Sequence, residues 1–156
     1  MAAPDPETLR FLYEHIRAVP REQQRTGEAL DDKVVKCLTA GGVLLGFSAI
    51  ATLGDANASV VIFAIGALIA FALLAAVAIL QLKPVDYRIT DDRGAWDSQW
   101  DQPVEDAMLA IVTDTATSFT ANDDLNAAKA KSVRRALVLL AVEGGCVAIS
   151  AITGAF

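Results

Sequence analysis

The sequence has 156 residues, of which 54% are hydrophobic and 21% are charged, and its mean hydropathy is +0.42. A chain this apolar collapses into a core or enters lipid, which excludes an intrinsically disordered protein. The net charge of -6 leaves no global attraction for nucleic acid, so the composition argues against a nucleic-acid partner.

The first 33 residues are charged and carry a helical pattern. Asp5 followed by Pro6 and Glu7 is a helix start, with an N-cap, a proline at the first helical position and an acid near the positive end of the dipole. An apolar stripe then recurs at spacings of three and four: Leu9, Leu12, Ile16 and Val19. Pro20 is expected to kink or interrupt this helix, and a second helix is expected to run from about Arg21 without a break into the apolar region. We predict an N-terminal helical segment over 1–33.

Three long stretches then almost lack charge: 37–54, 56–82, and 136–156, which is broken only by Glu143. At 1.5 Å rise per residue, about 20 residues cross a bilayer core, so each stretch is long enough to span. The sequence therefore predicts an all-α membrane protein with three transmembrane helices. The first two form a hairpin over 34–82, and the third occupies 136–156.

The segment 83–135 joins the hairpin to the third span. Residues 83–102 are expected to form a loop, and Pro103 is expected to begin a helix that joins the third span, unless residues 121–125 interrupt it. An apolar face is expected on this helix: Val104, Met108, Ile111, Thr115 and Phe119, with Leu125 further along. Its partner is the stripe in 1–33 or a copy in a neighbouring subunit.

The 13 Lys and Arg residues set the expected orientation. They fall in two groups, before or at the start of the first span and between the second and third spans: Arg10, Arg17, Arg21, Arg25, Lys33 and Lys36, then Lys83, Arg88, Arg93, Lys129, Lys131, Arg134 and Arg135. The positive-inside rule places the N-terminus and 83–135 in the cytoplasm and the C-terminus outside. We expect a multi-pass protein of the inner membrane that contacts the lipid bilayer directly.

Small residues favour close helix packing, since transmembrane helices associate through backbone approach. Gly42 and Gly46 lie on one face of the first span with Thr39 and Ala49. Gly66 with Ala70 and Gly144 with Ala141, Ala148 and Ala151 mark the other two spans. These faces serve either packing within one chain or a homo-oligomer, and the sequence leaves both open.

Glu143 is the most informative residue. A charged side chain near the bilayer centre costs about 3 kcal/mol unless it is paired, protonated or hydrated. Either Glu143 lines a pore, gates it or marks a subunit interface, or it is protonated or hydrogen-bonded to a hydroxyl such as Thr39 or Ser48. Lys36 is a candidate partner, although its position also suits the cytoplasmic interface.

Aromatic and basic side chains occur together in the segment 83–102. Trp96 and Trp100, with Arg88 and Arg93, suit either an interfacial anchor or a stacking platform that contacts a nucleotide. Motifs for a nucleophile elbow, a phosphate-binding loop or a zinc site are absent, so no enzyme, metal or cofactor is expected. The acid pairs at 31–32, 91–92 and 123–124 are expected to face water.

The segment AlaLeuAspAspLysValValLysCysLeuThrAlaGlyGlyValLeuLeu at 29–45 resembles the junction before the first span in the Pycsar transmembrane effector family. Asp32 and Lys33 carry the shared motif, with Val34 where alanine is usual. The order of helices is also similar to that family and to the related SLATT effectors. The resemblance implies a prokaryotic anti-phage protein that assembles and impairs the inner membrane when a partner cyclase makes a cyclic nucleotide, sensed directly or through a partner protein.

In such an effector, Glu143 and the small-residue faces are expected to meet other subunits in the active form. Two other classes remain as alternatives, a constitutive small ion channel or transport subunit and a non-conducting scaffold or receptor.

Overall fold

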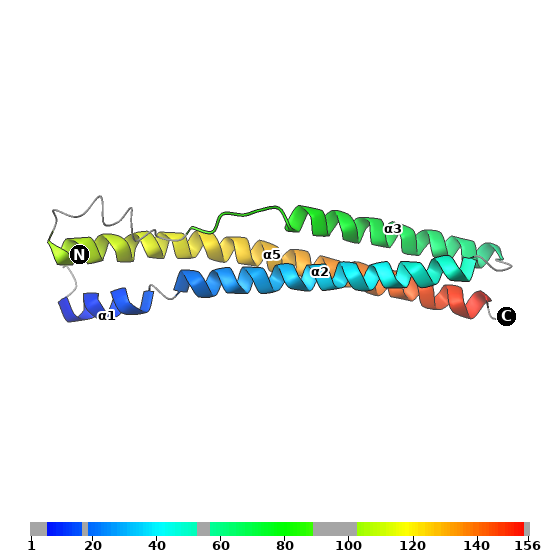
Figure 1. Cartoon of the computed structure of the whole chain (residues 1–156), viewed down its shortest axis with the longest axis horizontal. Coiled ribbons are helices and arrows are strands. Elements are labelled where there is room, and N and C mark those ends of the chain that lie inside the picture. Colours follow the sequence, from blue (N-terminus) through cyan, green and yellow to red (C-terminus); the bar gives the residue numbers. More distant parts are fainter. Residues whose placement is uncertain (1–5, 17–18, 53–56, 89–102, 155–156) are drawn as a thin grey trace. The chain divides into compact units, whose positions relative to one another are not determined.

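The computed structural model describes residues 6–16, 19–52, 57–88 and 103–154. They form the helices α1 (Pro6–Ile16), α2 (Val19–Thr52), α3 (Ala58–Gln81) and α5 (Val104–Gly154), shown in Figure 1. These ranges contain no strand, so the expected all-helical class is confirmed. Three helical stretches, containing α2, α3 and α5, are long and apolar enough to cross a membrane, which indicates a membrane protein.

The helix limits follow local sequence signals. α1 begins at Pro6, as predicted, and α2 begins at Val19, with Pro20 in its first turn where a proline displaces no helical hydrogen bond. α3 is capped by Asn57, whose side-chain oxygen accepts a hydrogen bond from the Val60 amide at 3.0 Å. The described residues 83–88 are not helical, in agreement with the predicted loop, and the remainder of that loop lies outside the described residues.

The chain divides into two compact units, Met1–Glu28 with Val85–Ala127, and Ala29–Pro84 with Ala128–Phe156. In the second unit α2 and α5 run parallel to each other and antiparallel to α3 (Figure 1). Two buried apolar layers fix this register, each with one residue from every helix. The first apolar layer is Val34, Ala78 and Val133, and the second is Cys37, Leu74 and Ala136.

Buried positions in the second unit are separated by three, four or seven residues. On α2 and α5 they are Val34, Cys37, Gly41 and Ser48, then Lys129, Val133, Ala136, Glu143 and Ser150. A 3.5-residue spacing is typical of helices that pack side by side with a slight left-handed supercoil. The outward positions carry exposed large side chains such as Phe47, Ile62 and Leu80. Only 22%, 22% and 17% of the three most apolar windows is buried, so most of their surface suits contact with lipid.

The buried positions of α5 in the first unit are polar, which corrects part of the expected apolar stripe. Met108 and Ile111 of that stripe are half-buried, and Thr115, which was also predicted on it, is buried. Leu9 is buried, but Val104 and Phe119 are exposed, and the buried positions on α5 are Thr115, Ser118, Asn122 and Asn126. Hydrogen bonds offset part of the cost of this burial: Gln23 Nε2 donates to the Phe119 carbonyl at 3.0 Å, and Asn126 donates to the Gln23 carbonyl at 2.9 Å. Gln23 Oε1 has no hydrogen-bond partner among the described residues.

α5 continues without a break through residues 121–125, so the alternative of an interruption there was wrong. The amide of Asn122 bonds across to Arg88, accepting from its backbone N–H at 3.0 Å and donating to its carbonyl at 2.9 Å. Asn tends to end helices because its side chain competes for nearby backbone groups. Here that side chain is occupied by another segment, and the helix backbone remains intact.

Candidate functional site

The candidate site is built around Glu143, whose side chain is fully buried in the second unit. Neither carboxylate oxygen has a hydrogen-bond partner among the described residues. The carboxylate lies against Gly41 of α2: a Cβ placed on Gly41 would come within 2.7 Å of Glu143 Oε2, 2.9 Å of Leu74 Cδ2 and 3.2 Å of Phe71 Cδ2. All three helices therefore enclose this carboxylate.

Gly41 provides the space that Glu143 occupies. A glycine inside a helix is unfavourable by about 1 kcal/mol relative to alanine, so its presence here needs a packing reason. Any larger side chain would overlap both the carboxylate and Leu74. Sequence reasoning missed Gly41 and named Gly42, because the two neighbouring glycines differ only in which face of α2 they occupy.

A polar row continues from Glu143 toward the C-terminal end of α5. Ser150, seven residues further on, is 1% exposed, and its hydroxyl has no partner among the described residues. Ser48 stands in the same relation to Gly41 on α2 and is 2% exposed. Seven residues make two helical turns, so each pair lies on one face. Polar groups thus occupy inward positions of a bundle whose outer surface is apolar.

In the opposite direction the two apolar layers separate Glu143 from a polar cluster. Asp31 forms a salt bridge with Lys129 and accepts a hydrogen bond from the Gln81 side chain at 3.3 Å. The Lys129 and Asp31 side chains are only 10% and 28% exposed. The expectation that the acid pair 31–32 simply faces water is wrong for Asp31, which joins α2, α3 and α5.

The structure corrects two of the partners considered for Glu143. Lys36 forms a 2.6 Å salt bridge with Asp32, and both side chains are mostly exposed. Thr39 is exposed and donates to the Val35 carbonyl at 3.0 Å. Ser48 is buried, yet Glu143 forms no hydrogen bond within the described ranges.

The four glycines of the small-residue faces separate into two groups. Gly66 and Gly144 pack within the chain, since a Cβ on them would lie 3.2 Å from Cys146 Sγ and 3.7 Å from Leu44 Cδ1. Gly42 and Gly46 are exposed, with Phe71 Cε2 at 3.9 Å from the first and nothing within 4 Å of the second. The face of α2 that carries Thr39, Gly42, Gly46 and Ala49 is outward.

The candidate nucleotide contacts are described only in part. Arg88 is exposed, and its backbone is held by Asn122. Arg93, Trp96 and Trp100 lie outside the described residues. No group of three or more His, Cys, Asp or Glu side chains in the described ranges is arranged to hold a metal ion.

No family model, no curated protein and no solved structure matches this sequence. The resemblance of residues 29–45 to the Pycsar transmembrane effectors therefore stays a prediction.

Proposed function

We propose that this protein is a non-enzymatic, pore-forming effector that spans the inner membrane and permeabilises it as a homo-oligomer. The observation that supports this most directly is Glu143, a carboxyl group buried without a partner in an apolar span. Intramembrane ionisable groups are costly and characteristically line ion pathways or helix interfaces. The proposed topology has the N-terminus and residues 83–135 in the cytoplasm, as the positive-inside rule predicts.

The proposed mechanism uses two states. In the closed state the two apolar layers exclude water between the Asp31 cluster and Glu143, because a narrow hydrophobic constriction dewets. In the open state α2, α3 and α5 move apart at these layers, and Glu143 with Ser48 and Ser150 lines a hydrated path. A carboxylate in such a path favours cations.

Assembly would use the outward face of α2. Gly46 has open space beside it, and Gly42 has only a ring edge at van der Waals distance, so a neighbouring helix could approach both closely. The trigger in this proposal, a cyclic nucleotide acting directly or through a cyclase-linked partner, rests on the resemblance of residues 29–45. A trigger can shift the two states only by binding them with unequal affinity.

The test compares Glu143→Gln with the parent and with Asp124→Asn, which removes an exposed acid from the same helix. Membrane potential is measured in cells after induced expression, with the variants at matched abundance. We expect Glu143→Gln to reduce depolarisation about tenfold and Asp124→Asn to match the parent. A Glu143→Gln protein that depolarises as strongly as the parent would contradict the proposal.

Leu74→Ser tests the apolar constriction independently. A hydroxyl in the second apolar layer lowers the barrier to water, so this variant should leak more than the parent without any trigger. Helix content measured by circular dichroism in detergent shows whether the variant is folded. A folded Leu74→Ser protein with no added leak would remove the layer from the mechanism.

The polar row within a single chain also supports a second candidate, a constitutive cation channel. Purified parent protein in planar bilayers separates the two functions. Steady conductance without any nucleotide favours the constitutive channel, whereas silence until a trigger is added favours the effector.

A further inference from the structure

Three cationic side chains of α5 lie beside the apolar bundle, and none of them has an acidic partner among the described residues. Lys131, Arg134 and Arg135 form no salt bridge with any described residue. Two neighbouring cations differ in this respect, since Lys129 pairs with Asp31 and Lys36 pairs with Asp32. The unpaired group is therefore a local excess of positive charge.

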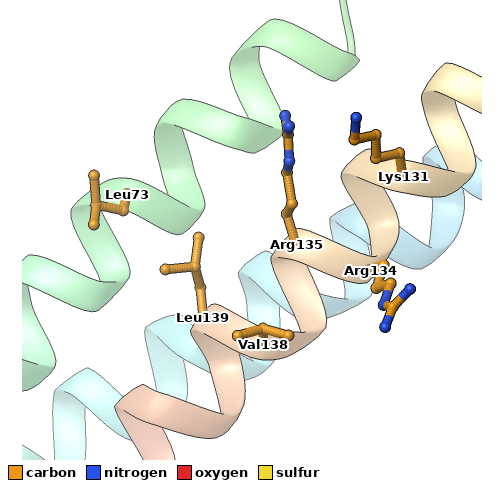
Figure 2. A pocket seen from close by; sticks show the side chains of 6 residues that line it. All are labelled: Leu73, Lys131, Arg134, Arg135, Val138 and Leu139. Carbon is orange, nitrogen blue, oxygen red and sulfur yellow. The ribbon is translucent and has the colours of Figure 1, made fainter.

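These cations line one open groove between α5 and α3. Its volume is about 540 Å³, and its apolar wall consists of Leu73, Val138 and Leu139. Figure 2 shows the Lys131 and Arg135 side chains extending from α5 in the same direction, with Arg134 directed elsewhere. Their spacing of four residues places Lys131 and Arg135 on one helix face. Within the part of the chain that the structure describes, no acidic side chain lines the groove.

The helix register places both cations beside apolar surface. Leu74 of α3 is level with Ala136 of α5, and Gln81 is level with the Asp31–Lys129 pair. Arg135 therefore lies roughly 10 Å, at 1.5 Å per residue, inside the end of the uncharged α3. At this depth long cationic side chains reach toward headgroups, and an anionic headgroup can in turn meet them.

We propose that this groove binds an anionic phospholipid, with its phosphate between Lys131 and Arg135 and an acyl chain along Leu73, Val138 and Leu139. The charge of the groove complements a phosphate, and its apolar wall complements the chain attached to that phosphate. The proposal requires α3 and α5 to lie in a bilayer, but it does not require the protein to form a pore.

The experiment counts lipids retained by the full chain in native mass spectrometry. The protein is taken from vesicles of equal phosphatidylglycerol and phosphatidylcholine. Lys131→Gln with Arg135→Gln is compared with Lys33→Gln with Lys83→Gln, which removes the same charge from exposed positions of the same unit outside the groove. We expect the groove pair to lose phosphatidylglycerol preference about tenfold and the control pair to keep it. Equal losses in the two pairs would overturn a specific site.

A second comparison tests the acyl-chain wall without changing charge. Val138→Trp fills the groove, whereas Val142→Trp places the same bulk at an exposed position one turn beyond it. Only Val138→Trp should reduce phosphatidylglycerol retention, and equal retention by both variants would overturn the assigned wall. Added inorganic phosphate should leave the lipid in place, and displacement by phosphate alone would overturn the lipid assignment in favour of a simple anion site.

Discussion

At the scale of single residues, the candidate site depends on the fit between Glu143 and Gly41. The carboxyl group is enclosed because one helix lacks a side chain where another projects a long one. Helical side chains lean toward the N-terminus, so Glu143 reaches back to the level of Gly41 and Phe71. The neighbouring Gly42 lies on an exposed face and plays no part in this enclosure.

We predict that Gly41→Leu destabilises the second unit by about 1–3 kcal/mol, because the new side chain overlaps Glu143 and Leu74. Gly145→Leu is the matched control, since Gly145 is exposed and nothing lies within 4 Å of its Cβ position. Loss of helix signal during SDS titration of protein in mixed micelles measures the difference. Equal midpoints for the two variants would show that Gly41 is not tightly packed.

At the scale of helices, the start of α3 has a local cause. α3 needs a cap because the free N–H groups of its first turn would otherwise lack partners at the edge of the apolar region. Asn57 supplies an acceptor for Val60 and also donates to the Thr153 carbonyl of α5 at 3.1 Å. One side chain thus begins α3 and ties it to the end of α5.

Asn57→Ala should lower stability by about 1 kcal/mol through loss of the cap. Asn57→Asp keeps an oxygen acceptor for the Val60 amide and should retain most of that stability, while losing the donor to Thr153. Thermal unfolding in detergent, followed by circular dichroism, measures both variants. If alanine and aspartate are equally destabilising, the bond to Thr153 matters more than the cap.

At the scale of the whole molecule, polar contacts between distant segments define the helix register. The Asp31–Lys129 salt bridge joins residues 98 positions apart, and Gln81 adds the third helix. Apolar helices can shift along one another at little cost in free energy. A partly buried ion pair between two helices forms at one alignment only. This cluster therefore specifies how α2, α3 and α5 align in the second unit.

Asp31→Asn should cost about 3 kcal/mol, because it removes the carboxylate that forms a salt bridge with the mostly buried Lys129 side chain. The double variant Asp31→Asn with Lys129→Gln should recover part of this loss, since no unpaired charge remains. The unfolding free energies of the parent, of Asp31→Asn, of Lys129→Gln and of the double variant form a thermodynamic cycle. Additive effects would mean that the two side chains do not interact.

Much of the architecture was accessible from sequence because it depends on local composition. The start at Pro6, the end of the second apolar helix and the continuous join into 136–156 were all predicted, and the helices agree. The start of α2 differs slightly from the prediction, since this helix begins at Val19 and not at about Arg21. Glu143 was identified because a carboxyl group in an apolar stretch is conspicuous by itself. The predicted apolar stripe was wrong for Val104 and Phe119, because α5 buries polar side chains such as Asn122 and Asn126 in the first unit, and hydrophobicity alone does not predict such positions.

The sequence by itself determined the helices and their apolar character, since helix length and hydropathy are properties of neighbouring residues. Only the tertiary structure decided that Gly41 rather than Gly42 encloses Glu143, and that Asp31 pairs with Lys129 while Lys131 and Arg135 have no acidic partner among the described residues. These outcomes depend on rotation and register between helices. Rotation and register are set by contacts among residues far apart in the chain, and the spacing along one helix does not encode them.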